Sequence, residues 1–267
     1  MDTQPPLIKE KPGRDPEIEI VIPVFKNADT VEELYERLKT TLKAVTASWG
    51  ILFVDDGCPH DSLLVLTMLA SKDDRVSVIA LSANVGQHRA VMVGLSYSRA
   101  KIVVIMDADL QDPPGSIPVI VAELKRGPDK AVFAGRAGAY ESPFRLFTSR
   151  LFKRVLHVLT GVPRDAGLFV AMDREMVDRV LRFGAPHPFV VALIGLTQLP
   201  CRSIPVTRKP RPHGNSAYSS WRRLITTCRA LHFVIFYRLN LATGSSKPTR
   251  PEIKAIYGPA SELRVDS

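Results

Sequence analysis

Short apolar runs alternate with amphipathic segments along the first half of the chain. The apolar runs indicate buried strands, because they are short and end in polar residues; they lie at 17–24, 50–57, 76–81, 101–107 and 130–135. Segments with apolar residues at helical spacing lie between them, at 30–47, 61–71, 86–100 and from the residues after Pro114 to about Lys125. This alternation predicts an α/β fold whose central sheet is mainly parallel and covered by helices on both faces.

The second half of the chain has a less regular pattern. We expect a basic amphipathic helix, a strand, a helix and a strand, in that order, at 144–159, 166–172, 173–183 and 200–207. A polar loop follows at 208–220. We therefore divide the chain into a flexible tail, one α/β domain, a separate segment and a C-terminal tail, with bounds at 1–16, 17–220, 221–240 and 241–267.

The segment at 221–240 mixes arginines with large apolar side chains. Trp221, Arg222 and Arg223 open it, and a run of leucine, isoleucine, valine and phenylalanine follows. This composition is typical of an amphipathic helix that lies in a membrane interface. It fits equally well a core helix packed on the sheet, and both interpretations remain open.

Four of the expected strands end in residues that can carry chemistry. In open parallel sheets, ligands bind beyond the carboxyl ends of the strands, where such residues meet at one edge. The four strand ends carry Pro23 and Phe25, Asp55 and Asp56, Asp107 and Asp109, and Gly135 and Arg136. The pattern therefore predicts a ligand site at this edge of the sheet.

The strand end at 107–114, with the sequence DADLQDPP, favours a metal ion. Pro113 and Pro114 force the chain away from the sheet, so the preceding side chains can converge. The Asp109 carboxylate and the Gln111 amide oxygen are hard ligands suited to Mg²⁺ or Mn²⁺. The alternative is that the acids only end the strand and cap the next helix.

Charge and composition narrow the classes of partner. The 267 residues carry a net charge of +9 with a pI of about 9.6, which indicates an anionic partner or a solvated basic surface. A nucleic-acid-binding protein is a remote alternative, because aromatic residues make up only 7% and form no stacking platform. No G-x-G-x-x-G follows a strand, which argues against a dinucleotide enzyme.

Three observations bear on location. The three cysteines are scattered, no secretory signal is visible, and no run of about 18 apolar residues occurs. We expect a cytoplasmic protein without a transmembrane helix.

Six motifs together resemble the GT-A-type glycosyltransferases of family 2, and within them the polyprenyl-phosphate hexose synthases such as dolichyl-phosphate mannose synthase. The resemblance runs from about Glu17 to Tyr218. Its motifs are VDDG at 54–57, LSANVGQHRAVMVGL at 81–95, DADLQDPP at 107–114, AGR at 134–136, DAGLFVAMDR at 165–174 and RPHGNSAYS at 211–219. The relatives often carry C-terminal transmembrane hairpins, and we expect none in this sequence. The resemblance implies a GT-A fold and inverting transfer of a hexose from UDP-hexose or GDP-hexose.

The resemblance also implies roles for individual residues. It assigns the donor to Pro23, Phe25, Asp55, Asp56, Asp107 and Arg136. It assigns Mg²⁺ or Mn²⁺ to Asp107, Asp109 and Gln111. It assigns the acceptor to Arg211 and Ser216, and catalysis to Asp109, Arg211 and Asp165.

The acceptor has two candidate chemistries. A phosphate monoester, such as a polyprenyl phosphate, is already anionic at neutral pH and needs guiding cations, which the basic loop at 208–211 provides. A hydroxyl acceptor in polysaccharide or glycolipid assembly needs a positioned base, for which Asp165 is the candidate. A polyprenyl phosphate lies in the bilayer, so we expect peripheral binding at the inner face of the cytoplasmic membrane, through anionic lipid or a membrane partner protein.

Overall fold

The computed structural model describes residues 15–59, 61–137, 143–183, 185, 187–207, 231–232, 234–235 and 251–258. At 136–137 and 143–151 it describes the backbone alone.

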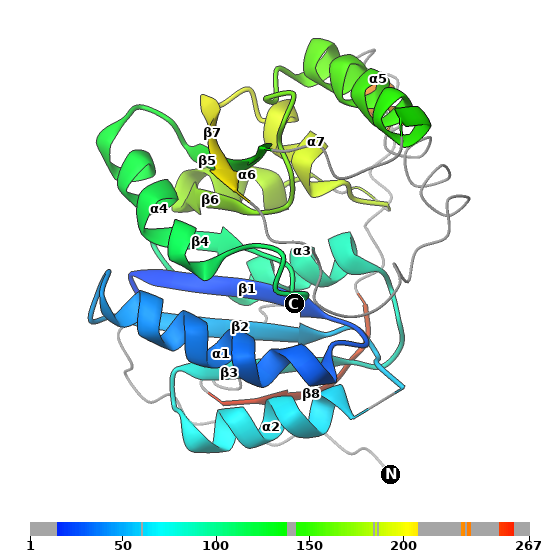
Figure 1. Ribbon diagram of the computed structural model, residues 1–267. Helices are drawn as coiled ribbons and strands as arrows, with labels where there is room; N and C mark the ends of the chain where they lie inside the picture. Colours follow the sequence, from blue (N-terminus) through cyan, green and yellow to red (C-terminus); the bar gives the residue numbers. More distant parts are fainter. Residues whose placement is uncertain are drawn as a thin grey trace.

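One eight-stranded sheet forms the centre of the fold (Figure 1). Its strands are β1 (Ile18–Val24), β2 (Trp49–Asp55), β3 (Val76–Leu81), β4 (Ile102–Ile105), β5 (Ala131–Ala137), β6 (Val170–Asp173), β7 (Cys201–Thr207) and β8 (Ile253–Tyr257). The order across the sheet is β7-β5-β6-β4-β1-β2-β3-β8. Strands β1 to β4 are parallel, β5 is parallel to β7, and β6 and β8 run antiparallel to their neighbours. The predicted mainly parallel α/β fold is confirmed.

Helices cover the two faces of this sheet and bury separate apolar clusters. The helices are α1 (Ala28–Lys43), α2 (Ser62–Lys72), α3 (Gln87–Tyr97), α4 (Ile117–Arg126), α5 (Pro143–Thr160), α6 (Arg174–Leu181) and α7 (Val190–Leu196), with a 3₁₀ turn at Pro114–Ser116. Helices α1, α2 and α4 pack on one cluster, and α3, α6 and α7 on the other. Alternate side chains of each strand enter opposite clusters, as Phe53 and Val54 of β2 do.

Two differences from the sequence-based expectations stand out. The predicted C-terminal tail is wrong at Ile253–Tyr257, because these residues form edge strand β8 beside β3. Helix α7 was not predicted, because its sequence VVALIGL is buried all round and has no amphipathic period. Among the described helices, none is both long and apolar enough to cross a membrane.

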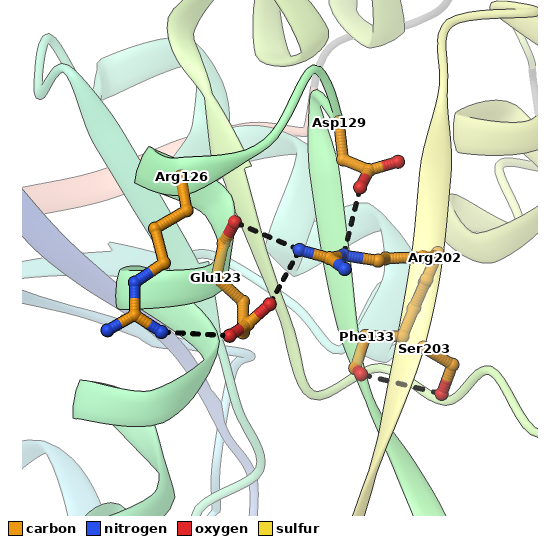
Figure 2. Close-up of polar contacts among 6 residues, drawn as sticks. All are labelled: Glu123, Arg126, Asp129, Phe133, Arg202 and Ser203. Carbon is orange, nitrogen blue, oxygen red and sulfur yellow. Dashed lines mark hydrogen bonds and ion pairs between the residues drawn. The ribbon is translucent and has the colours of Figure 1, made fainter.

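A network of ion pairs holds edge strand β7 in place (Figure 2). The Arg202 guanidinium of β7 lies 2.6 Å from a Glu123 carboxylate oxygen on α4 and 2.9 Å from an Asp129 oxygen in the turn before β5. Glu123 also pairs with Arg126 at 3.2 Å. Because the segment that follows β7 is the loop expected to bind the acceptor, this network fixes the strand from which that loop departs.

Candidate functional site

The carboxyl ends of the central strands meet at one edge of the sheet. Strand β1 pairs with β2 on one side and with β4 on the other. Beyond the strand ends, the Asp56 N–H donates to the Val24 carbonyl at 2.9 Å, and the Met106 N–H donates to the Val21 carbonyl at 3.3 Å. The acidic residues that follow β2 and β4 therefore stand on the same edge, separated by the end of β1.

Asp55, the last residue of β2, is nearly enclosed, with 2% of its surface exposed. Burial raises the pKa of its carboxyl group. One oxygen, Oδ2, accepts a long hydrogen bond of 3.4 Å from the Cys58 N–H. The other, Oδ1, is buried and has no hydrogen-bond partner among the described residues. Because an unsatisfied buried acceptor is costly, Oδ1 is a favourable target for a ligand N–H group.

Asp56 has a structural role in the same turn. Its carboxylate accepts hydrogen bonds from the Val85 N–H at 2.7 Å, the Gly86 N–H at 3.0 Å and the Asn84 side-chain amide at 3.0 Å. Burial raises the pKa of Asp56 to about 6, although the Val85 and Gly86 N–H groups act in the opposite direction. The side chain predicted to contact the donor therefore holds the loop between β3 and α3.

The turn after β4 gives its three carboxylates different environments. Asp112 is fully buried and its Oδ2 accepts from the Asp107 N–H at 3.5 Å, so it closes the turn. Asp107 and Asp109 are half-buried and lie just beyond the carboxyl end of β4. Asp107 accepts from the side-chain amide of Gln87, and Asp109 accepts from the Gln111 N–H at 3.1 Å.

The donor set of this turn fits a divalent ion shared with a substrate. Asp107, Asp109 and Gln111 supply hard oxygen atoms within five residues. Among the described residues, no three His, Cys, Asp or Glu side chains come together as a metal site. Mg²⁺ is usually held by one or two carboxylates together with substrate phosphates, and the two carboxylates of this turn match that requirement.

Asp165 lies over the carboxyl half of β5. Its Oδ2 accepts a hydrogen bond of 2.8 Å from the Ser203 hydroxyl of β7. A Cβ atom on Gly135 would lie only 2.0 Å from the same oxygen. The absence of a side chain at Gly135 thus allows this carboxylate to approach the strand end, near the backbone of Arg136.

The remaining predicted residues lie as follows. Pro23 is buried in β1 opposite Val54, and Phe25 is half-buried with the Lys26 ammonium 5.4 Å from its ring centre. The Arg136 backbone pairs with β7. Arg211 and Ser216 lie outside the described residues.

Sequence reasoning missed two residues that contact the predicted carboxylates: Gln87, which donates to Asp107, and Ser203, which donates to Asp165. Gln87 had a signal, because it opens the helix after Gly86 within the motif at 81–95. Ser203 had no such signal.

Comparison with known proteins assigns the family. The model of glycosyl transferase family 2 matches residues 19–181. The chain therefore belongs to glycosyl transferase family 2.

Two curated relatives are similar over most of this chain. One is an undecaprenyl-phosphate 4-deoxy-4-formamido-L-arabinose transferase of Salmonella choleraesuis, 33% identical over 209 residues, which are 77% of this chain and 63% of the relative. The other is an uncharacterized glycosyltransferase of Bacillus subtilis, 32% identical over 203 residues, which are 74% of this chain and 62% of the relative. The chain thus spans about six tenths of the length of these relatives.

Solved structures share the GT-A fold. Glucosyl-3-phosphoglycerate synthase from Mycobacterium tuberculosis, in complex with Mn²⁺, UDP and glucosyl-3-phosphoglycerate, matches with a TM-score of 0.58 at 18% identity, over 93% of this chain and 92% of that one. A mannosyltransferase from Pyrobaculum calidifontis, in complex with GDP-mannose and Mn²⁺, matches with a TM-score of 0.58 at 17% identity, over 87% of this chain and 68% of that one.

Proposed function

We propose that this protein transfers a hexose, with inversion at C1, from a nucleotide-sugar donor to a polyprenyl-phosphate acceptor. The observation that carries the proposal is the meeting of Asp55, Asp107 and Asp109 at the carboxyl edge of β2, β1 and β4. Two kinds of similarity support it: family membership, and a relative whose name gives undecaprenyl phosphate as the acceptor. Incubation with labelled UDP-hexose or GDP-hexose and polyprenyl phosphate tests it, with formation of a labelled lipid as the readout.

Asp107, Asp109 and Gln111 are the residues that would hold Mg²⁺ or Mn²⁺. Such an ion neutralises the charge that develops on the leaving nucleoside diphosphate. Gln87 orients the Asp107 carboxylate, because its amide donates to one oxygen. Asp112 is buried and closes the turn, and the two half-buried carboxylates of Asp107 and Asp109 are the ones that we propose for the ion.

The acceptor end of the site would be cationic. A phosphate monoester is already charged at neutral pH and needs no base, so its attack on C1 depends on position and charge. Arg211 and Arg136 are the proposed phosphate partners, since guanidinium groups bind phosphate oxygens in pairs. Ser216 is a further proposed contact. The Arg136 backbone pairs with Val206 of β7, and Arg211 follows β7 in the sequence.

A second candidate is transfer to a hydroxyl acceptor in polysaccharide or glycolipid assembly. The observation that favours it is the half-buried Asp165 carboxylate, which Ser203 and the space over Gly135 hold at the strand end. Such a carboxylate can take the proton of an attacking hydroxyl.

The Asp165→Asn variant separates the two candidates. Because a phosphate acceptor carries no proton that must be removed, we expect kcat with polyprenyl phosphate to fall by less than about tenfold. A hydroxyl acceptor would lose about 10²–10⁴ in kcat, the usual contribution of a general base. The asparagine retains an oxygen that can accept from Ser203, so the local fold is expected to persist. Steady-state rates with both acceptor classes measure the difference.

We also propose that the protein is cytoplasmic and binds the inner face of the cytoplasmic membrane peripherally, directly or through a membrane partner. The basic residues Arg208, Arg211, Arg222 and Arg223 carry this proposal from the sequence. Each cation near an anionic membrane contributes about 1 kcal/mol before screening, so four arginines contribute about 4 kcal/mol.

Sedimentation with anionic liposomes tests the direct membrane contact. We expect the protein to pellet with the liposomes at low salt and to be released at high salt. Replacement of Arg222 and Arg223 by glutamate should abolish the sedimentation. The control, with the same change in net charge, replaces the exposed Lys43 and Lys72 by glutamate and should still sediment. Wild-type protein that stays in the supernatant at low salt would refute direct binding.

A further inference from the structure

The first turn of helix α3 stands at the ligand edge of the sheet and has little support of its own. Its N-cap residue is Gly86, with a φ of 92°, which has no side chain to cap the helix. The first N–H groups of a helix have no partner within it, so an uncapped first turn is easily disturbed. This turn nevertheless carries Gln87, whose amide donates to the Asp107 carboxylate of the proposed ion site.

Two contacts from outside the helix hold this turn, one before Gln87 and one after it. On one side, the Asp56 carboxylate accepts from the Gly86 N–H at 3.0 Å. On the other side, the His88 ring reaches the start of helix α7. Its Nδ1 accepts from the Val190 N–H at 3.4 Å, in a long hydrogen bond between residues 102 positions apart in the chain. Gln87 therefore lies between two anchored neighbours.

Aromatic packing also fixes the His88 ring. It lies on Phe189, with the ring centres 4.6 Å apart and the planes tilted by 57°. The Phe189 ring meets Phe152 of α5 edge-on, with the centres 5.8 Å apart. Helix α7 itself packs closely on α5, since a Cβ atom on Gly195 would lie 2.6 Å from the Thr160 hydroxyl oxygen. Helix α7 is thus a firm anchor for the imidazole.

The hydrogen bond to α7 requires a neutral imidazole. Because Nδ1 of His88 accepts, the ring proton is on Nε2. Burial lowers the pKa of His88 to about 4, so the ring stays neutral near pH 7. A protonated ring would have no lone pair at Nδ1 and would face the Val190 N–H with a second donor.

We propose that His88 is a positioning residue for the ion site: by anchoring the first turn of α3 to α7, it fixes the Gln87 amide that orients Asp107. This inference rests on the proposed function, because it assumes that Asp107 helps to bind an ion together with a nucleoside diphosphate. With Asp56 on one side and His88 on the other, Gln87 has little freedom to turn away from the carboxylate. Without the His88 anchor, binding of the ion would have to order this turn, at a cost in affinity.

Calorimetric titration with a nucleoside diphosphate in the presence of Mn²⁺ tests the proposal. UDP and GDP are the probes, and the one that binds the wild type more tightly is used for the variants. In His88→Leu, which keeps an apolar side chain but has no acceptor, the Kd should rise about tenfold, the effect of losing one buried hydrogen-bond partner. In His88→Asn, the side-chain oxygen takes the place of Nδ1, so the Kd should stay within about threefold of the wild type. His88→Gln places its oxygen near the position of Nε2 and should resemble His88→Leu.

A double-mutant cycle tests the path through Gln87. In Gln87→Met the amide is gone, so the first turn of α3 no longer acts on Asp107. The addition of His88→Leu to Gln87→Met should therefore raise the Kd by less than about twofold, compared with about tenfold in the wild type. Ile120→Val, at a buried position of α4 on the opposite face of the sheet, is the control for a general loss of stability. Its Tm should fall and its Kd should stay unchanged.

Three results would overturn the assignment. An unchanged Kd in His88→Leu means that the ring does not position the ion site. Equal losses in His88→Leu and His88→Asn mean that ring packing matters and the acceptor at Nδ1 does not. Fold-changes that multiply in the double variant mean that His88 acts on the ligand without Gln87. In each of these cases the wild-type protein still binds a nucleoside diphosphate with Mn²⁺, whereas the absence of binding of both probes would count against the proposed function itself.

Discussion

The Asp109→Asn variant is expected to lose sugar transfer almost completely while it remains folded. Asp109 is half-buried in the turn after β4, and its Oδ1 accepts from the Gln111 N–H. An asparagine oxygen can still accept this bond, so the turn should persist. The substitution removes a negative charge from the proposed ion site. We expect kcat to fall by about 10²–10³, as when one electrostatic group of a transition state is removed.

Two measurements separate loss of the ion from loss of the fold. Urea unfolding of Asp109→Asn should agree with the wild type within about 0.5 kcal/mol, as for surface substitutions. The rise in Tm that UDP causes in the presence of Mn²⁺ should shrink strongly. Asp74→Asn, at an exposed aspartate before β3, is the matched control and should keep both activity and the Tm shift. Full activity of Asp109→Asn would remove Asp109 from the metal site.

Among glycine-to-alanine substitutions at this edge of the sheet, Gly57→Ala is expected to lower the free energy of unfolding the most. Gly57 has a φ of 60°, in the left-handed region that favours glycine. A Cβ atom there would lie 2.4 Å from the Ala83 carbonyl carbon and 2.6 Å from the Asn84 nitrogen. These are backbone atoms, so no side-chain rotation relieves the clash. We expect a loss of about 2–4 kcal/mol in the free energy of unfolding.

The clash should also weaken donor binding, because Asp56 holds the same 84–86 loop through its carboxylate. Urea unfolding and UDP titration measure the two effects. Gly115→Ala is the control, since a Cβ atom there meets nothing within 4 Å, and its stability should stay within about 0.5 kcal/mol of the wild type. A Gly57→Ala variant as stable as Gly115→Ala would contradict the described packing of this turn.

The sequence predicts the fold well where burial follows the strand and helix periods. Strand β2 has every residue buried, and α1 buries one stripe, including Leu34, Leu38 and Leu42, so both patterns are explicit. The ligand edge follows from the same reasoning, because residues after parallel strands must gather at one edge. For this reason Asp55, Asp107 and Asp109 could be assigned to the same edge from the sequence alone.

Tertiary contacts determine which acidic side chains of the two motifs are buried or already hydrogen-bonded, and the sequence does not show this. Nothing in DADLQDPP shows that Asp112 faces inward and closes the turn while Asp109 stays half-exposed. In the same way, VDDG does not reveal that Asp56 is occupied by the loop after β3.

Strand β8 is an element that the local sequence does not predict. Its five residues, IKAIY, follow a long polar stretch and have only partial burial. They form a strand because the edge of β3 offers unpaired backbone groups, which is a property of the folded sheet and not of the local sequence. The shift in register at Lys254, between the Ala80–Ala255 and Leu81–Ile253 pairs, depends on that pairing in turn.

Sugar transfer to two matched lipid acceptors tests the central claim most directly. Labelled UDP-hexoses and GDP-hexoses are incubated with the protein, Mn²⁺ and either a polyprenyl phosphate or the corresponding polyprenol. We expect label in the lipid only with the phosphate, only in the presence of the divalent ion, and not with Asp109→Asn. The anomeric configuration of the product should be inverted relative to the donor. Transfer to a hydroxyl acceptor with no transfer to polyprenyl phosphate would contradict the account.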